Sequence, residues 1–95
     1  APKMEDNEKT IAELQARIDK TRAFLKTISP SQVNGKEAVR IALPYWRDKS
    51  MSGGEYVANY LIPNFYFHLT TAYSIMRSNG VHIGKDDFMG PLPLE

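Results

Sequence analysis

The stretch YVANYLIPNFYFHLTTAYSI, residues 56–75, decides the fold of this chain. Its large apolar residues point in every direction around a helix instead of forming one stripe. They are Val57, Tyr60, Leu61, Ile62, Phe65, Phe67, Leu69, Ala72 and Ile75. A helix that is apolar nearly all round is buried on several sides. The stretch therefore predicts a helix that needs more than one packing partner.

The residues on either side of this stretch set the bounds of the helix. Ser52 followed by Glu55 matches a capping box, and Asn79-Gly80 is a typical helix end. The predicted helix therefore runs from about residue 53 to about 79. Because Pro63 lies inside it, we expect a kink and a carbonyl group at Asn59 that lacks its helical partner.

An amphipathic segment, TIAELQARIDKTRAFLKTIS, lies further upstream, over residues 10–29. Its apolar residues recur three and four apart and form one stripe, which predicts a helix over about residues 7–29. They are Ile11, Leu14, Ile18, Leu25 and Ile28. One stripe covers only one side of the later helix, so two helices do not complete a core.

Polar residues mark both ends of this first helix. Thr10 with Glu13 three residues later matches a capping box, although Asp6 or Asn7 would start the helix a turn earlier. Ser29-Pro30 is expected to end the segment, because proline removes a donor and disfavours helix in the residue before it.

Residues 30–52 predict an irregular connection that contains a small hairpin. The segment AVRIAL alternates like a short strand up to Pro44, and the second strand is expected near Met51. Between the strands lie Tyr45 and Trp46, which are either an exposed anchor for a partner or a lid on the core. The lid is favoured, because a small core needs their area.

The tail, residues 80–95, contains glycine and proline at several points and is expected to be an ordered coil or short turn. It is held in place if Val81, Ile83 and Phe88 reach the core. With only 95 residues in total, residues 1–95 are expected to form a single domain.

Composition argues against several classes of protein. The 12 Lys and Arg residues balance 11 Asp and Glu residues without a long basic run, so nucleic acid is not an expected partner. No apolar run is long enough to span a membrane. The chain has no cysteine, which removes disulfides and thiolate chemistry, and it starts without the apolar segment of a signal peptide. A cytoplasmic location is expected.

Four polar side chains lie along one face of the apolar helix and form the candidate site. Tyr60, Asn64, His68 and Thr71 follow one another at helical spacing. In one interpretation each group finds a hydrogen bond inside the bundle, as buried polar groups usually do. In a second, they line a polar pocket in which His68 is a metal ligand or an acid and base. In a third, they form a surface for a partner.

Other polar residues in the tail are weaker candidates for a metal site. His82 lies in the loop after the helix, near Asp86 and Asp87. Nothing in the sequence fixes the geometry of these three side chains, and a closed zinc site needs four ligands. A surface or packing role for His82 is therefore expected.

The segment PNFYFHLTTAYSIMRSNGVHIGKDDFMG, residues 63–90, resembles the C-terminal part of the DUF1993 family. The segments TIAELQARIDKTRAFLKTIS and GKEAVRIALP are similar to the preceding helix and connection of that family. DUF1993 is a bacterial group within the DinB/YfiT-like superfamily of proposed metalloenzymes. The resemblance implies a mainly all-α fold, an up-down-down-up four-helix bundle of which this chain resembles the C-terminal half.

The resemblance implies less about activity. DinB-like proteins that bind a divalent metal use three histidines, two of them spaced HxxxH on the last bundle helix, and some relatives transfer low-molecular-weight thiols. Only His68 matches such a position here, because Ala72 stands four residues later. The third ligand would come from an N-terminal helical pair that this chain lacks. No cofactor is therefore expected, and a divalent metal on His68 is the alternative.

These observations favour a non-catalytic assembly or binding module of the DUF1993 type, with a protein or small-molecule partner. The alternative is a DinB-like metal protein or thiol-transferase-type enzyme that uses His68. Because the helices leave apolar faces uncovered, we expect a homodimer in which two helical hairpins form one four-helix bundle. Its core would contain the apolar faces of the second helix together with Leu14, Ile18 and Leu25.

Overall fold

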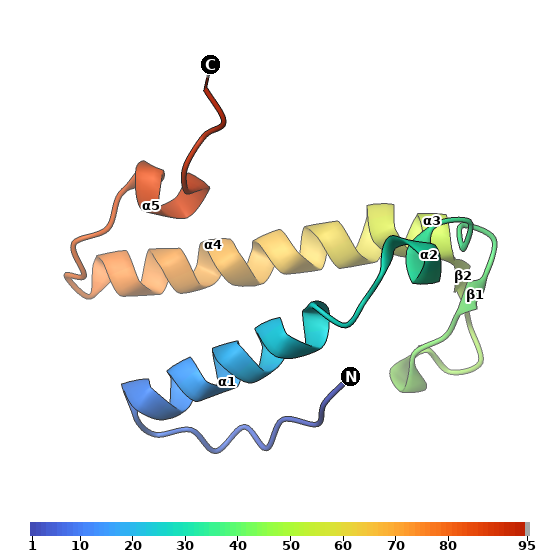
Figure 1. Cartoon of the computed structure of the whole chain (residues 1–95), viewed down its shortest axis with the longest axis horizontal. Helices are drawn as coiled ribbons and strands as arrows, with labels where there is room; N and C mark the ends of the chain where they lie inside the picture. The colour runs from blue at the N-terminus through green and yellow to red at the C-terminus, as the bar shows by residue number, and fades with distance from the viewer. Residues whose placement is uncertain (95) are drawn as a thin grey trace. The chain divides into compact units, whose positions relative to one another are not determined.

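The structure, a computed structural model, describes residues 1–94 (Figure 1). It contains 56% helix and 4% strand, which confirms the mainly helical fold class. The chain divides into two compact units, Ala1–Lys36 and Glu37–Glu95. The expectation that residues 1–95 form one domain stays a prediction.

The first unit is built on helix α1 (Ile11–Leu25). The predicted capping box is present: the Thr10 hydroxyl accepts from the Glu13 amide, and the Glu13 carboxylate accepts from the Thr10 amide at 2.8 Å. The helix starts later and ends earlier than the predicted residues 7–29. It ends before Ser29 because the Thr27 amide and hydroxyl both bond to the Phe24 carbonyl and turn the chain.

A one-turn helix, α2 (Pro30–Val33), follows where an irregular connection was expected. Ser29 is its N-cap, and the Ser29 amide donates to the Gln32 side chain at 2.7 Å. The Ser29-Pro30 pair therefore starts a helix here in addition to ending a segment. Proline suits the first helical position, since the amide it lacks would have no partner there.

The second unit opens with the predicted hairpin. Strand β1 (Arg40–Ile41) pairs antiparallel with β2 (Met51–Ser52), with Arg40 opposite Ser52. Between the strands, the 3-10 turn η1 (Pro44–Trp46) leads into Arg47 and Asp48, which both have left-handed backbone conformations. Two successive left-handed residues reverse the chain within the hairpin.

The long helical run occupies the predicted range but has an unpredicted π-helical segment. It comprises α3 (Gly53–Glu55), the π-helical η2 (Tyr56–Leu61) and α4 (Ile62–Ser78). The predicted Ser52–Glu55 capping box is present. The Ile62 amide bonds to the Val57 carbonyl, five residues back. The irregularity precedes Pro63, because a wider turn makes room for a ring that would clash with the carbonyl four residues earlier.

The long helix ends as predicted at Asn79 and Gly80, where Gly80 has a φ of +85°. The tail, expected as coil or a short turn, forms helix α5 (Lys85–Met89). The ring of Phe88 packs edge-on against Tyr73 of α4, with the centroids 5.5 Å apart. Phe88 therefore fixes α5 to the end of α4, beside which α5 lies in Figure 1.

None of the described residues is buried. On α4 the exposed fractions of Phe65, Phe67 and Ile75 are 58%, 65% and 57%. On α1, Leu14, Ile18 and Leu25 are exposed as well. A helix as apolar as α4 is normally covered on several sides. Each helix therefore has an apolar surface that its own unit does not cover. Within the described residues, no helix combines the length and the apolar character needed to cross a membrane.

Candidate functional site

The four residues of the predicted polar face lie on one continuous helical run. Tyr60 lies near the end of η2 and is half-buried, whereas Asn64, His68 and Thr71 lie on α4 and are exposed. No hydrogen bond links these four side chains to one another among the contacts described for residues 1–94. Their role as a ligand pocket stays a prediction.

Tyr60 has a partner on the hairpin. Its hydroxyl shares a hydrogen bond with the hydroxyl of Tyr45. This hydrogen bond, followed by desolvation, raises the pKa of Tyr45 to about 12. The Tyr60 hydroxyl is thus satisfied within the unit, as the first interpretation of the polar face expects for this residue.

Four aromatic rings meet where the hairpin contacts η2, and we call them the aromatic cluster: Tyr45, Trp46, Tyr56 and Tyr60. The Trp46 ring lies 6.3, 6.2 and 5.5 Å from those of Tyr45, Tyr56 and Tyr60. Tyr56 and Tyr60 are stacked at 5.4 Å. Trp46 thus folds back onto the helix as the lid interpretation expects, while Tyr45 remains 63% exposed.

The imidazole of His68 contacts the ring of its neighbour Phe67, edge-on with the centroids 5.3 Å apart. Within the part of the chain that the structure describes, no three His, Asp or Glu side chains gather as a metal-binding group. The position four residues after His68 is Ala72. These residues by themselves do not fit the three-histidine set of a DinB-like metal centre.

The acidic residues of the tail have a structural role. The Asp87 carboxylate accepts a hydrogen bond of 2.8 Å from the Gly84 amide and so caps α5. Asp86 and Asp87 both lie in the first turn of that helix, where negative charge is favourable. Asp87 therefore caps α5, and His82 is exposed on the loop before that helix.

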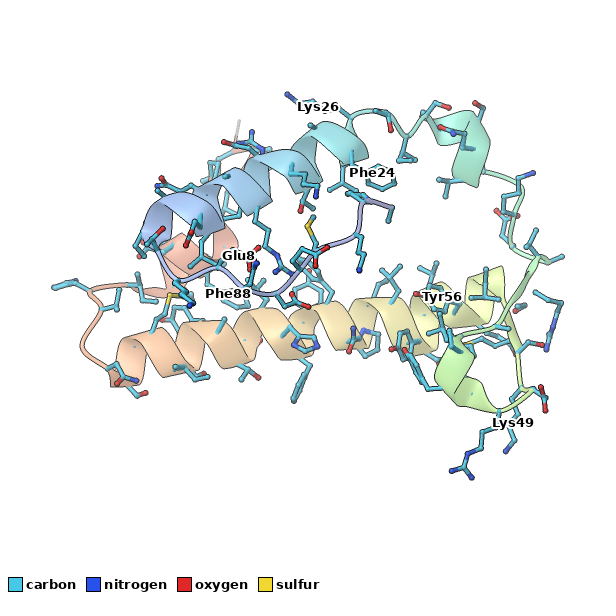
Figure 2. The ribbon with its side chains drawn as sticks, turned by 90° about the horizontal axis from the view of Figure 1, so that it is seen from below. Glu8, Phe24, Lys26, Lys49, Tyr56 and Phe88 are labelled. Atoms are coloured by element: carbon cyan, nitrogen blue, oxygen red, sulfur yellow. The ribbon has the colours of Figure 1, made fainter. Side chains whose placement is uncertain are left out.

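A pocket that the sequence did not predict lies at the hairpin. It has a volume of about 400 Å³ and is lined by Trp46, Lys49, Ser50 and Met51. Figure 2 shows Lys49 on the hairpin loop and Tyr56 at the start of the long helix. The hairpin pattern was visible in the sequence, but nothing in it placed these four side chains around a cavity.

Comparisons with known proteins agree with the fold. The family model for a domain of unknown function, DUF1993, matches residues 1–89. The crystal structure of a DinB family member protein from Shewanella denitrificans matches with a TM-score of 0.93 and 41% sequence identity. The match covers 100% of this chain and 53% of that protein, so the chain spans about half of its length. No curated protein matches the chain.

Proposed function

Because the chain belongs to the DUF1993 family, we propose that it is an assembly and binding module, one half of a DinB-like four-helix bundle. The observation that carries this proposal is the exposed apolar surface of α4. Four large side chains share one side of the long helical run and are between 37% and 58% exposed: Leu61, Phe65, Leu69 and Ile75. Such a surface serves to bind another helical surface.

The free energy at stake is large for a small domain. Burying one large apolar side chain fully contributes roughly 1.5–3 kcal/mol. Four partly exposed side chains therefore forgo several kcal/mol, against a total stability of about 5–15 kcal/mol for a typical domain. A partner that covers the face of α4 would be a principal source of stability.

A second copy of the chain is the partner that we propose. The Shewanella denitrificans protein is about twice as long as the region that matches this chain, and it is a DinB family member. Two copies of this chain supply a similar number of residues. A two-fold axis also lets the same apolar face cover itself, as a symmetric interface requires.

The alternative function, a divalent-metal protein or thiol-transferase-type enzyme, stays a prediction. His68 is exposed on α4, so its nitrogen atoms are accessible to a metal ion. Further ligands would have to come from outside the described residues, since these contain no metal-binding group. No observation favours this alternative over the assembly module.

Charge substitution on opposite sides of α4 tests the proposal. Phe65 and Ser74 are nine residues apart, which is two and a half helical turns. In size-exclusion chromatography with light scattering, we expect a dimer for the wild-type chain and for Ser74→Asp. Phe65→Asp should give a monomer or an unfolded chain, because a carboxylate in an apolar interface is costly. A monomeric, folded wild-type chain would contradict the proposal, as would a Phe65→Asp variant that dimerises normally.

A further inference from the structure

The hairpin pocket is open to solvent and has the volume of a small-molecule site. Its volume of about 400 Å³ lies within the usual range for ligand pockets, roughly 300–1,000 Å³. Trp46 and Met51 provide an indole ring and a thioether, which both favour aromatic ligands. All four lining residues belong to one compact unit.

The polar part of the pocket offers hydrogen-bond donors. Lys49 carries an ammonium group, and no acidic residue lines the pocket. The Ser50 hydroxyl oxygen lies 3.1 Å from Nε and 2.9 Å from Nη2 of Arg40, and so accepts from the guanidinium. An oxygen that accepts from a guanidinium keeps its own hydrogen for donation. Lys49 and Ser50 therefore both suit a negatively charged acceptor.

Two of the four lining side chains, Trp46 and Ser50, are held in place before any ligand arrives. Trp46 contacts three tyrosine rings of the aromatic cluster. The Arg40 guanidinium also donates to the Ser50 carbonyl at 2.6 Å, and the Lys49 amide bonds to the Trp46 carbonyl at 3.1 Å. Because these two side chains are already ordered, they lose less entropy when a ligand binds.

From these contacts we propose that the hairpin pocket binds a small aromatic carboxylate. The aromatic body of the ligand lies against Trp46 and Met51, and its carboxylate accepts from Lys49 and Ser50. This site is separate from the helix face proposed for assembly, since it is formed by the hairpin. It also does not depend on His68.

The single tryptophan of the chain makes a direct test possible. In a ¹H–¹⁵N NMR spectrum, the indole N–H gives one resonance, which reports on the pocket itself. The probes are 2-naphthoate, its neutral analogue 2-naphthamide and the non-aromatic cyclohexanecarboxylate. We expect a saturable shift of the indole resonance with 2-naphthoate. Each analogue should bind about tenfold more weakly, because 2-naphthamide loses roughly one charge-assisted contact and cyclohexanecarboxylate loses roughly one ring contact.

Variants at two lysines complete the experiment. Lys49→Gln should weaken 2-naphthoate binding about tenfold and leave 2-naphthamide binding unchanged. Lys85→Gln, on α5 and outside the lining residues, is the matched control and should bind 2-naphthoate like the wild type. The proposal is overturned if the acid and the amide bind equally, or if Lys49→Gln behaves like the control. It is also overturned if 2-naphthoate shifts α4 resonances and leaves the indole unchanged.

Discussion

The indole ring of Trp46 stands nearly perpendicular to the phenol ring of Tyr60, at 84° with the ring centroids 5.5 Å apart. Trp46 belongs to the hairpin turn η1, and Tyr60 belongs to the π-helical segment η2. Perpendicular ring contacts of this kind contribute beyond simple burial. The contact therefore fixes the hairpin to the long helix at the point where the helical geometry changes.

Replacing Trp46 should weaken the second unit more than replacing another half-exposed aromatic residue. Trp46→Ala removes three ring contacts, each worth about 0.5–1.5 kcal/mol, so we expect a loss of about 1.5–4.5 kcal/mol in unfolding free energy. Trp46→Phe should recover part of that loss. Urea denaturation followed by far-ultraviolet circular dichroism measures both variants. An alanine variant as stable as the wild type would show that the cluster does not hold the hairpin.

The hydrogen bond between Tyr45 and Tyr60 predicts a pH dependence in alkaline solution. The pKa of Tyr45 rises from an ordinary value of 10.0 to about 12. Because the folded state has the higher pKa, this contribution to stability is complete below about pH 10 and is lost as the pH rises toward 12. In a pH titration followed by tyrosinate absorbance, one tyrosine of the wild type should ionise later than the others. In the Tyr60→Phe variant, Tyr45 should ionise at the ordinary pH of a tyrosine, because its hydrogen-bond partner is gone. Identical titration curves for the two proteins would contradict the assignment.

The capping box of α3 predicts a pH dependence in acid. The Ser52 side-chain and backbone hydrogen bonds lower the pKa of Glu55 below its ordinary value of 4.5. A lowered folded-state pKa contributes stability above 4.5, and this contribution is lost as the pH falls through the folded-state value. Glu55→Gln should therefore flatten the acid side of the stability curve. The measurement is the urea midpoint of the variant and of the wild type across the acid range. If the midpoint depends on pH equally in both proteins, the prediction is wrong.

Ser52 itself offers a second measurement on the same cap. Its hydroxyl oxygen accepts from the Glu55 amide at 3.3 Å. Ser52→Ala should lower the unfolding free energy by about 1 kcal/mol, the usual cost of losing an N-cap, and Ser52→Asp should largely preserve it. If alanine and aspartate variants melt at the same temperature, the cap contributes nothing to stability.

The parts of the fold that depend on short-range hydrogen bonds could be predicted from the sequence. Thr10 with Glu13 and Ser52 with Glu55 are three residues apart, and each capping box is present. The π-helical segment was not predicted, because it depends on how the turn before Pro63 relieves a steric clash. A proline in a helix indicates that some distortion occurs but does not say where it lies.

The hairpin pocket was missed for a different reason. The hairpin reverses through Arg47 and Asp48 in left-handed conformations, where Asn-Gly is the usual signal. Without that signal, the sequence does not show that Lys49, Ser50 and Met51 lie near Trp46. Helical spacing was enough to find the polar face formed by Tyr60, Asn64, His68 and Thr71. The hydrogen-bond partner of Tyr60, which is Tyr45 on the hairpin, could not be found in this way.

The assignment of His68 has a direct chemical test. Since Ala72 stands where an HxxxH pair with His68 needs a second histidine, the prediction is that the purified chain carries no stoichiometric divalent metal after dialysis. Elemental analysis of the wild type and of His68→Ala measures this. A stoichiometric metal that disappears in the variant, with the fold retained by circular dichroism, would instead support the metal-protein alternative.

The central claim, that a second copy covers the apolar face of α4, is tested most directly by sedimentation equilibrium at low micromolar concentration. The account predicts a particle of twice the chain mass of 10.8 kDa, which dissociates only as the chain unfolds. It also predicts that Phe65→Asp abolishes this particle while Ser74→Asp retains it. A well-folded monomer at that concentration, with its aromatic residues protected from solvent, would contradict the claim.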